Sequence, residues 1–167
     1  MRAFARAGDN DIGAELEPSE AALISQLAGQ VADLLAPSEF PSTDPAMIRL
    51  LPDAYSDDPE AADEFRRFTA DELSERKVRN AATVMSDLVD AATSEGPIEI
   101  LLDPESVQAW VRSLTDIRLV LAVRLGITND SDGGWDEEGE DEELLVLGEV
   151  YDWLGWVQDS LVTALDS

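Results

Sequence analysis

Apolar side chains recur every three or four positions over most of the chain, which is the spacing of amphipathic helices. The first stripe predicts a helix from about residue 18 to residue 36, since Pro18 suits a first helical turn. Its apolar line consists of Ile24, Leu27, Val31, Leu34 and Leu35. A short helix is predicted next over residues 44–51, with Asp44 as its N-cap.

The middle of the chain predicts two helices in succession. The first opens at Pro59 and is expected to pack through three apolar residues. These are Ala62, Phe65 and Phe68. Thr69 and Glu72 have the spacing of a capping box, so a second, longer helix is expected from there to about Thr93. Its inward line consists of Leu73, Lys77, Ala81, Val84 and Leu88.

The most apolar helix is predicted over residues 104–125, where apolar residues fall on nearly every side. A helix of that kind usually occupies the centre of a bundle. Gly126 fits as its C-terminal cap. A last helix is predicted from about Glu142 to Ala164, along an apolar line that also contains the polar Gln158.

Strands are predicted at three places. Short alternating runs at residues 4–6 and 12–16 flank the turn residues 8–11, which predicts a β-hairpin. Residues 98–102 form a third strand candidate that would complete a small sheet with the hairpin.

These elements together predict a mainly α (α+β) fold. We expect a single domain over residues 1–167, built as a bundle of about five to six helices around the helix at 104–125. A small N-terminal β-hairpin or three-stranded sheet would lie at one side of this bundle.

The charge of the chain limits its partners. Thirty-seven acidic residues against eleven basic ones give a net charge of −26, and residues 125–167 hold thirteen of the acids with no Lys or Arg. Such a field repels nucleic-acid phosphates and anionic lipid. Residues 128–143 hold nine acids and predict a mobile acidic loop. We therefore expect a protein partner, no tight binding to DNA by this chain alone and no membrane association.

The side chains of catalysis and metal binding are scarce. The chain has no His and no Cys, which removes the usual general base, thiol nucleophiles and common zinc ligands. The loop read from Asn129 matches a calcium-binding loop poorly, because position five is Gly133. We expect a non-enzyme with no cofactor and no metal. With no apolar run of membrane-spanning length and no signal core, we expect a cytoplasmic location.

The basic residues concentrate in one region, and most have an acid four residues earlier. The basic residues are Arg66, Arg67, Arg76, Lys77 and Arg79. The spaced pairs are Asp63 with Arg67, Glu72 with Arg76, and Glu75 with Arg79. Acid-first pairs at this spacing favour ion pairs on a helix. Salt-bridged, solvated faces are therefore expected here in preference to a DNA contact patch.

Two arginines stand out because they lie in the most apolar helix. A buried guanidinium needs a partner, so we predict a buried polar cluster of Arg118, Arg124, Asp53 and Tyr55. Asp116 and Asp152 are further partner candidates for Arg118. A cluster that fixes helix register is favoured over an anion or ligand site.

The tryptophans suggest a surface for a partner. Trp153 and Trp156 lie three residues apart on the last helix and would be binding anchors if they are partly exposed. A second buried face explains them equally well. The acidic loop residues Asp136, Glu137 and Glu138 would add charge for a basic partner.

Several of these segments resemble a known family. They are residues 49–55 (RLLPDAY), 64–66 (EFR), 110–119 (WVRSLTDIRL), 124–126 (RLG) and 151–154 (YDWL), together with Phe4 and the hairpin. The sequence is similar to an actinobacterial domain-of-unknown-function family that includes the AosR-type oxidative-stress transcription regulators. The resemblance covers nearly the whole chain.

The resemblance implies a regulator that acts with a sigma factor at stress and cysteine-biosynthesis promoters. Sensing in that type of regulator is attributed to a CxxxC dithiol, and this chain has no cysteine, which excludes a thiol switch within it. The function expected is thus a non-enzymatic regulatory interaction protein linked to transcription. The alternatives are a structural or adaptor protein outside transcription and, third, a carboxylate-based hydrolase.

Overall fold

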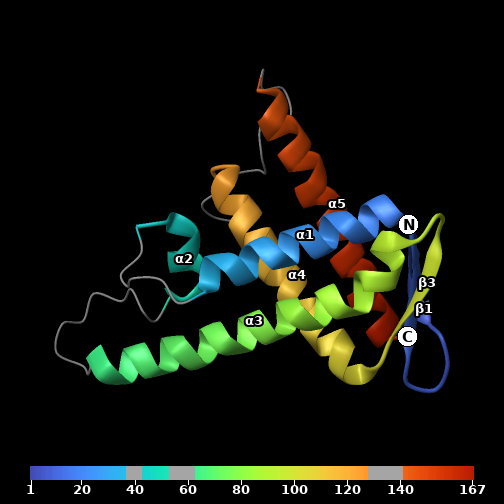
Figure 1. Cartoon of the computed structure of the whole chain (residues 1–167), viewed down its shortest axis with the longest axis horizontal. Helices are drawn as coiled ribbons and strands as arrows, with labels where there is room; N and C mark the ends of the chain where they lie inside the picture. Colours follow the sequence, from blue (N-terminus) through green and yellow to red (C-terminus); the bar gives the residue numbers. More distant parts are fainter. Residues whose placement is uncertain (37–42, 53–62, 128–140) are drawn as a thin grey trace.

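A computed structural model describes residues 1–36, 43–52, 63–127 and 141–167, and for residues 63–66 it describes the backbone alone. These ranges hold five helices and one three-stranded antiparallel sheet (Figure 1). The mainly α fold with a small N-terminal sheet is confirmed.

The sheet is formed by β1 (Arg2–Arg6), β2 (Ile12–Leu16) and β3 (Ile98–Leu102), with β2 in the middle. Both pairings are antiparallel, so the predicted hairpin and its third strand are confirmed. Gly13 on β2 permits this pairing, because an added Cβ would lie 3.1 Å from the Ala7 Cβ.

The first two helices begin where the sequence places them. The N-terminus of α1 (Pro18–Leu35) has a reciprocal capping box between Glu17 and Glu20. In α2 (Pro45–Leu50), the Asp44 carboxylate accepts a hydrogen bond from the Ala46 N–H at 2.9 Å, as expected of an N-cap.

The two helices predicted in the middle of the chain are one. A single 31-residue helix, α3, spans Asp63–Thr93, and Thr69 lies inside it. The stretch contains no Gly or Pro, so continuing the helix costs less than ending it and starting another. The expected packing of Phe68 is also wrong, because this side chain is 63% exposed. Pro59 and Ala62 lie outside the described residues.

The apolar helix predicted to be central is α4 (Pro104–Arg124), which contacts all four of the other described helices. Gly126 ends it with a φ of 76°, and the Ile127 N–H donates to the Ala122 carbonyl at 2.9 Å. This is the left-handed C-terminal cap that the sequence predicts. The last helix, α5 (Glu142–Leu165), packs against α4 and β1.

Trp110 of α4 lies at the heart of the core and has no exposed surface. Its ring meets Phe4 of β1 edge to face, with centroids 5.7 Å apart. Its indole N–H donates to the Asp87 carboxylate of α3 at 2.9 Å, so the one polar atom of this buried side chain is satisfied. Trp110 thereby joins the sheet, α3 and α4.

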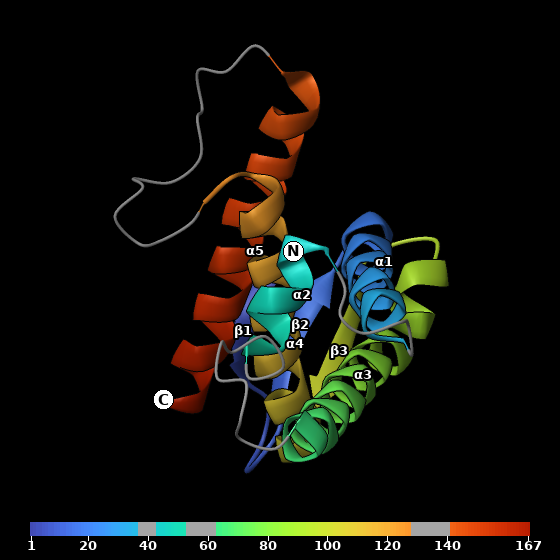
Figure 2. The same ribbon diagram turned by 90° about the vertical axis from the view of Figure 1, so that its left-hand side faces the viewer.

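The other long helices pack on two opposite sides of α4. Figure 2 shows α1 and α3 packed together on one side of it and α5 on the other, while the first turns of α5 project beyond the rest of the bundle. In the described ranges, no helix is both long and apolar enough to cross a bilayer.

Candidate functional site

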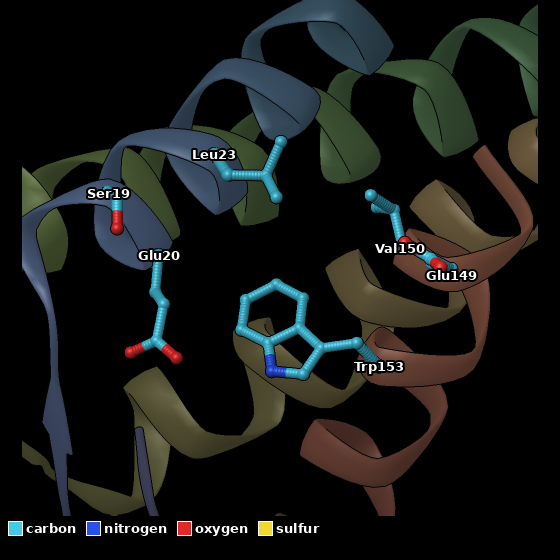
Figure 3. Close-up of a pocket in the computed structure, with 6 residues that line it drawn as sticks. All are labelled: Ser19, Glu20, Leu23, Glu149, Val150 and Trp153. Carbon is cyan, nitrogen blue, oxygen red and sulfur yellow. The ribbon is translucent and has the colours of Figure 1, made fainter. Parts of the chain in front are cut away.

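A shallow apolar groove of about 260 Å³ opens between the N-terminal part of α1 and the middle of α5. Its lining residues are Ser19, Glu20, Leu23, Glu149, Val150 and Trp153. Figure 3 shows the Trp153 ring directed from α5 toward α1, with Leu23 facing it from α1. We call this feature the α1–α5 groove.

The spacing of apolar residues on α5 extends the groove along the helix. Val146, Val150 and Trp153 follow one another at intervals of four and three, so they lie along one face. Val146, near the start of α5, is 61% exposed. Trp156 is 44% exposed and lies one turn beyond Trp153. The groove is therefore the middle of a longer apolar strip.

The surroundings of the groove are acidic. Glu149 is exposed on α5, and this helix contains no Lys or Arg. Glu20 is already engaged, since its carboxylate accepts from the Met1 ammonium at 2.8 Å and from the Glu17 N–H at 2.8 Å. The charge that remains available to a partner at the groove comes from α5.

The two tryptophans proposed as anchors thus have different environments. Trp153 is partly buried in the groove wall, and Trp156 is open to solvent. The acidic residues proposed beside them, Asp136, Glu137 and Glu138, lie outside the described residues. Their part in partner binding stays a prediction.

Arg118 of α4 has partners on α5 that the sequence did not reveal. Its Nη1 donates to the Gln158 Oε1 at 3.0 Å, and the guanidinium lies 4.9 Å from the centre of the Tyr151 ring. Gly155 makes room for it, because a Cβ there would lie 3.3 Å from Nη2. The buried Nε of Arg118 has no hydrogen-bond partner in the described structure.

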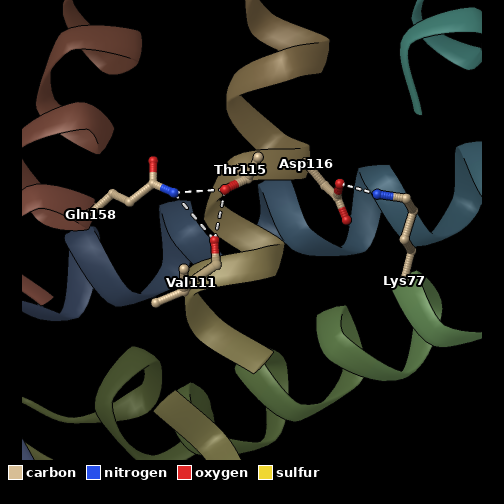
Figure 4. Close-up of polar contacts among 5 residues, drawn as sticks. All are labelled: Lys77, Val111, Thr115, Asp116 and Gln158. Carbon is tan, nitrogen blue, oxygen red and sulfur yellow. Dashed lines mark hydrogen bonds and ion pairs between the residues drawn. The ribbon is translucent and has the colours of Figure 1, made fainter. Parts of the chain in front are cut away.

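Gln158 is the residue that sequence reasoning missed. Its amide nitrogen donates to the Val111 carbonyl at 3.2 Å and to the Thr115 hydroxyl at 2.7 Å (Figure 4). With Arg118 on its oxygen, this side chain ties α5 to three residues of α4. The available signal was a polar residue on an otherwise apolar helical line.

Arg124 has a separate partner. Its Nη2 donates to the Asp44 carboxylate at 2.8 Å, which lowers the pKa of Asp44. This contact holds the end of α4 to the start of α2. Asp53 and Tyr55 lie outside the described residues, so the four-residue cluster stays a prediction. In the described structure, Arg118 and Arg124 form hydrogen bonds with different residues.

Arg118→Met is expected to lower the free energy of unfolding by about 1–3 kcal/mol, through loss of the charged hydrogen bond and the contact with Tyr151. The cost stays below that of breaking a buried ion pair, because the partner Gln158 is neutral and keeps its two bonds to α4. Urea denaturation of the variant would measure the difference. A loss above about 4 kcal/mol would point to an acidic partner.

A buried ion pair joins α3 to α4. The Lys77 ammonium donates to the carboxylate of Asp116, which is 3% exposed (Figure 4). Burial raises the pKa of Asp116, and the hydrogen bond from Lys77 opposes that rise. The sequence offers Asp116 as a candidate partner of Arg118, whereas in the structure Asp116 pairs with Lys77.

The predicted ion pairs along α3 are absent where they can be checked. Within the described side chains, Glu72 does not pair with Arg76 and Glu75 does not pair with Arg79. The side chain of Asp63 lies outside the description. These two acids and two bases are exposed on one face of α3 and together line a small pocket. Across the described ranges, no group of three or more acidic residues is arranged to hold a metal ion.

Known proteins resemble this chain over nearly its whole length. The family model of a domain of unknown function, DUF2017, matches residues 1–165. A Mycobacterium tuberculosis protein named oxidative stress regulator AosR is 32% identical over 178 residues, covering 90% of this chain and 80% of that protein. The Mycobacterium bovis protein of the same name gives the same figures.

A Mycobacterium leprae protein also given the AosR name is 30% identical over 180 residues, covering 89% of this chain and 79% of that protein. No solved structure matches the chain significantly. The family match extends over all five helices and the sheet described above. The chain therefore belongs to the DUF2017 family.

Proposed function

We propose that this chain is a non-enzymatic regulatory protein that controls transcription by binding a sigma factor. The naming of its relatives as oxidative stress regulators supports the regulatory role. The absence of His and Cys from the sequence supports a role in binding over one in catalysis. Because no cysteine is present, any stress signal reaches this chain by a route other than its own thiols.

The observation that carries the proposal is the α1–α5 groove. It offers an apolar floor with Trp153 in its wall, the half-exposed Trp156 beside it, and an acidic helix without any compensating base. Aromatic side chains in partly desolvated pockets are the usual anchors of protein interfaces. The surface fits a segment that carries one or two apolar side chains flanked by Lys or Arg.

Charge complementarity favours a sigma factor as the occupant. A protein that binds DNA presents basic surface, and opposite potentials speed the encounter of two proteins. This chain has a net charge of −26, and its last 43 residues, 125–167, contain no base. It would bind a basic surface of the partner directly and hold its own acidic helix α5 against it.

The proposal predicts weak binding to DNA by this chain alone. Arg76 and Arg79 are exposed on α3, but Glu72 and Glu75 lie beside them, and Lys77 is paired with Asp116. A surface that tracks phosphates needs several unopposed bases. We expect no binding to promoter duplex below about 1 μM at physiological salt.

A titration on promoter duplex, with and without the purified sigma factor, measures this directly. The expected result is a change in the affinity or promoter preference of the sigma factor, with no stable complex of this chain and DNA. Tight binding by the chain alone, with a steep dependence on salt, would contradict the proposal. Failure to bind a sigma factor, together with stable binding to a protein outside transcription, would support the adaptor function instead.

A further inference from the structure

A second pocket lies on the opposite side of α4 from α5, between α3 and α4. It has a volume of about 270 Å³, and three of its six lining residues are cationic. The lining residues are Leu73, Arg76, Lys77, Asn80, Arg112 and Asp116. None of them lines the α1–α5 groove, so the two sites are separate.

The charge of this pocket has the opposite sign to that of the chain. Three cations and one carboxylate line it, in a protein with a net charge of −26. Asp116 is neutralised by Lys77. Arg76 and Arg112 are exposed, and neither has an ion-pair partner in the described part of the chain, although Glu72 and Glu75 lie beside Arg76 in a neighbouring pocket. Two guanidinium groups are thus left facing one small cavity.

The donors in the pocket suit an anion. Each arginine has five N–H groups in a planar fork that matches carboxylate and phosphate oxygens. The Lys77 ammonium has three N–H groups, of which Asp116 receives one. Asn80 adds an amide at the same wall. Buried Asp116 acts here as a positioning residue, because its ion pair with Lys77 holds the ammonium in the lining of the pocket.

We propose that this α3–α4 pocket binds a compact anion, through the phosphate or carboxylate group of a small molecule. The net charge of the chain does not prevent this, because charges beyond about 8 Å are largely screened at physiological ionic strength. The volume admits a ligand smaller than a typical drug-sized molecule. The site would give a chain without thiols a signal that reaches it as a bound metabolite.

The test is a titration of the full-length chain with inorganic phosphate and, separately, with malonate. Ionic strength is held constant with NaCl, and NMR follows the Asn80 side-chain amide and the arginine Nε–H signals. We expect saturable shifts with a dissociation constant of about 1 mM or below for at least one anion. The anion that saturates identifies the ligand group as phosphate or carboxylate.

Two matched variants make the test specific. Arg112→Gln is expected to weaken binding at least about tenfold, since it removes a charged donor from the pocket. Arg79→Gln makes the same change on an exposed arginine outside the pocket and should leave binding intact. Shifts that never saturate with either anion would overturn the proposal, and so would equal weakening by the two variants. Neither result bears on the sigma-factor proposal, which concerns the other face.

Discussion

Lys77→Met is expected to lower the free energy of unfolding by about 3–5 kcal/mol at neutral pH, which is the usual cost of leaving one member of a buried ion pair unpaired. Asp116 would remain at 3% exposure without its ammonium partner. Urea denaturation at pH 7 measures the loss. A change below about 1 kcal/mol would show that water reaches Asp116 and stabilises its charge.

The loss of stability in Lys77→Met should depend on pH in a defined direction. Burial raises the pKa of Asp116 above 3.8, so ionising this carboxyl opposes folding, and that cost grows as the pH rises from about 4 through its raised folded pKa. Removing Lys77 removes the group that lowers the pKa, which raises it further. The deficit of Lys77→Met should therefore shrink as the pH falls toward 4, where Asp116 becomes protonated and neutral.

A double variant provides the control for this pair. Lys77→Met with Asp116→Leu removes both charges and fills the site with apolar groups, which usually restores stability to near the wild-type value or above it. If the double variant is as unstable as Lys77→Met alone at pH 7, the loss comes from packing and the unpaired charge is not its cause.

Trp110→Ala is expected to cost about 3–5 kcal/mol, because it leaves a large cavity where Trp110 has no exposed surface. It also breaks the edge-to-face contact with Phe4 and leaves the Asp87 carboxylate without the indole N–H. Since small domains have a total stability of only about 5–15 kcal/mol, we expect a substantial fraction of the variant to be unfolded at 37 °C.

Trp156→Ala is the matched control, since Trp156 is 44% exposed. It should change the free energy of unfolding by less than about 1 kcal/mol. Denaturation followed by circular dichroism compares the two variants without relying on tryptophan fluorescence. Equal losses for the two would mean that Trp110 does not hold the sheet to the helices.

Most of the fold could be predicted because its signals are local. Alternation and a turn predict strands at residues 4–6 and 12–16, and the structure extends the first of them to Arg2–Arg6. Asp44 and Gly126 mark helix ends through their own chemistry. The prediction that a new helix begins at Thr69 is wrong for the same reason. A capping box is a local pattern, and it cannot decide whether a strongly helical stretch simply continues.

The polar contacts were harder to predict because they depend on how helices far apart in the sequence pack. Lys77 and Asp116 are 39 positions apart, and Arg118 and Gln158 are 40 apart. Residue type showed that Arg118 needed a partner, but only the register of α4 against α5 places Gln158 beside it. Asp116 is one of the candidate partners that the sequence offers for Arg118, but residues two apart on a helix point in different directions, and Asp116 pairs with Lys77 instead.

We propose above that the acidic face around the α1–α5 groove binds a sigma factor. Calorimetry with the sigma factor tests it, using the wild-type chain, Glu149→Arg at the groove, and Glu75→Arg on α3 as a control with the same change in charge. We predict that Glu149→Arg weakens binding at least about tenfold, while Glu75→Arg stays close to wild type. No binding by the wild-type chain, or an equal effect of the two substitutions, would contradict the claim.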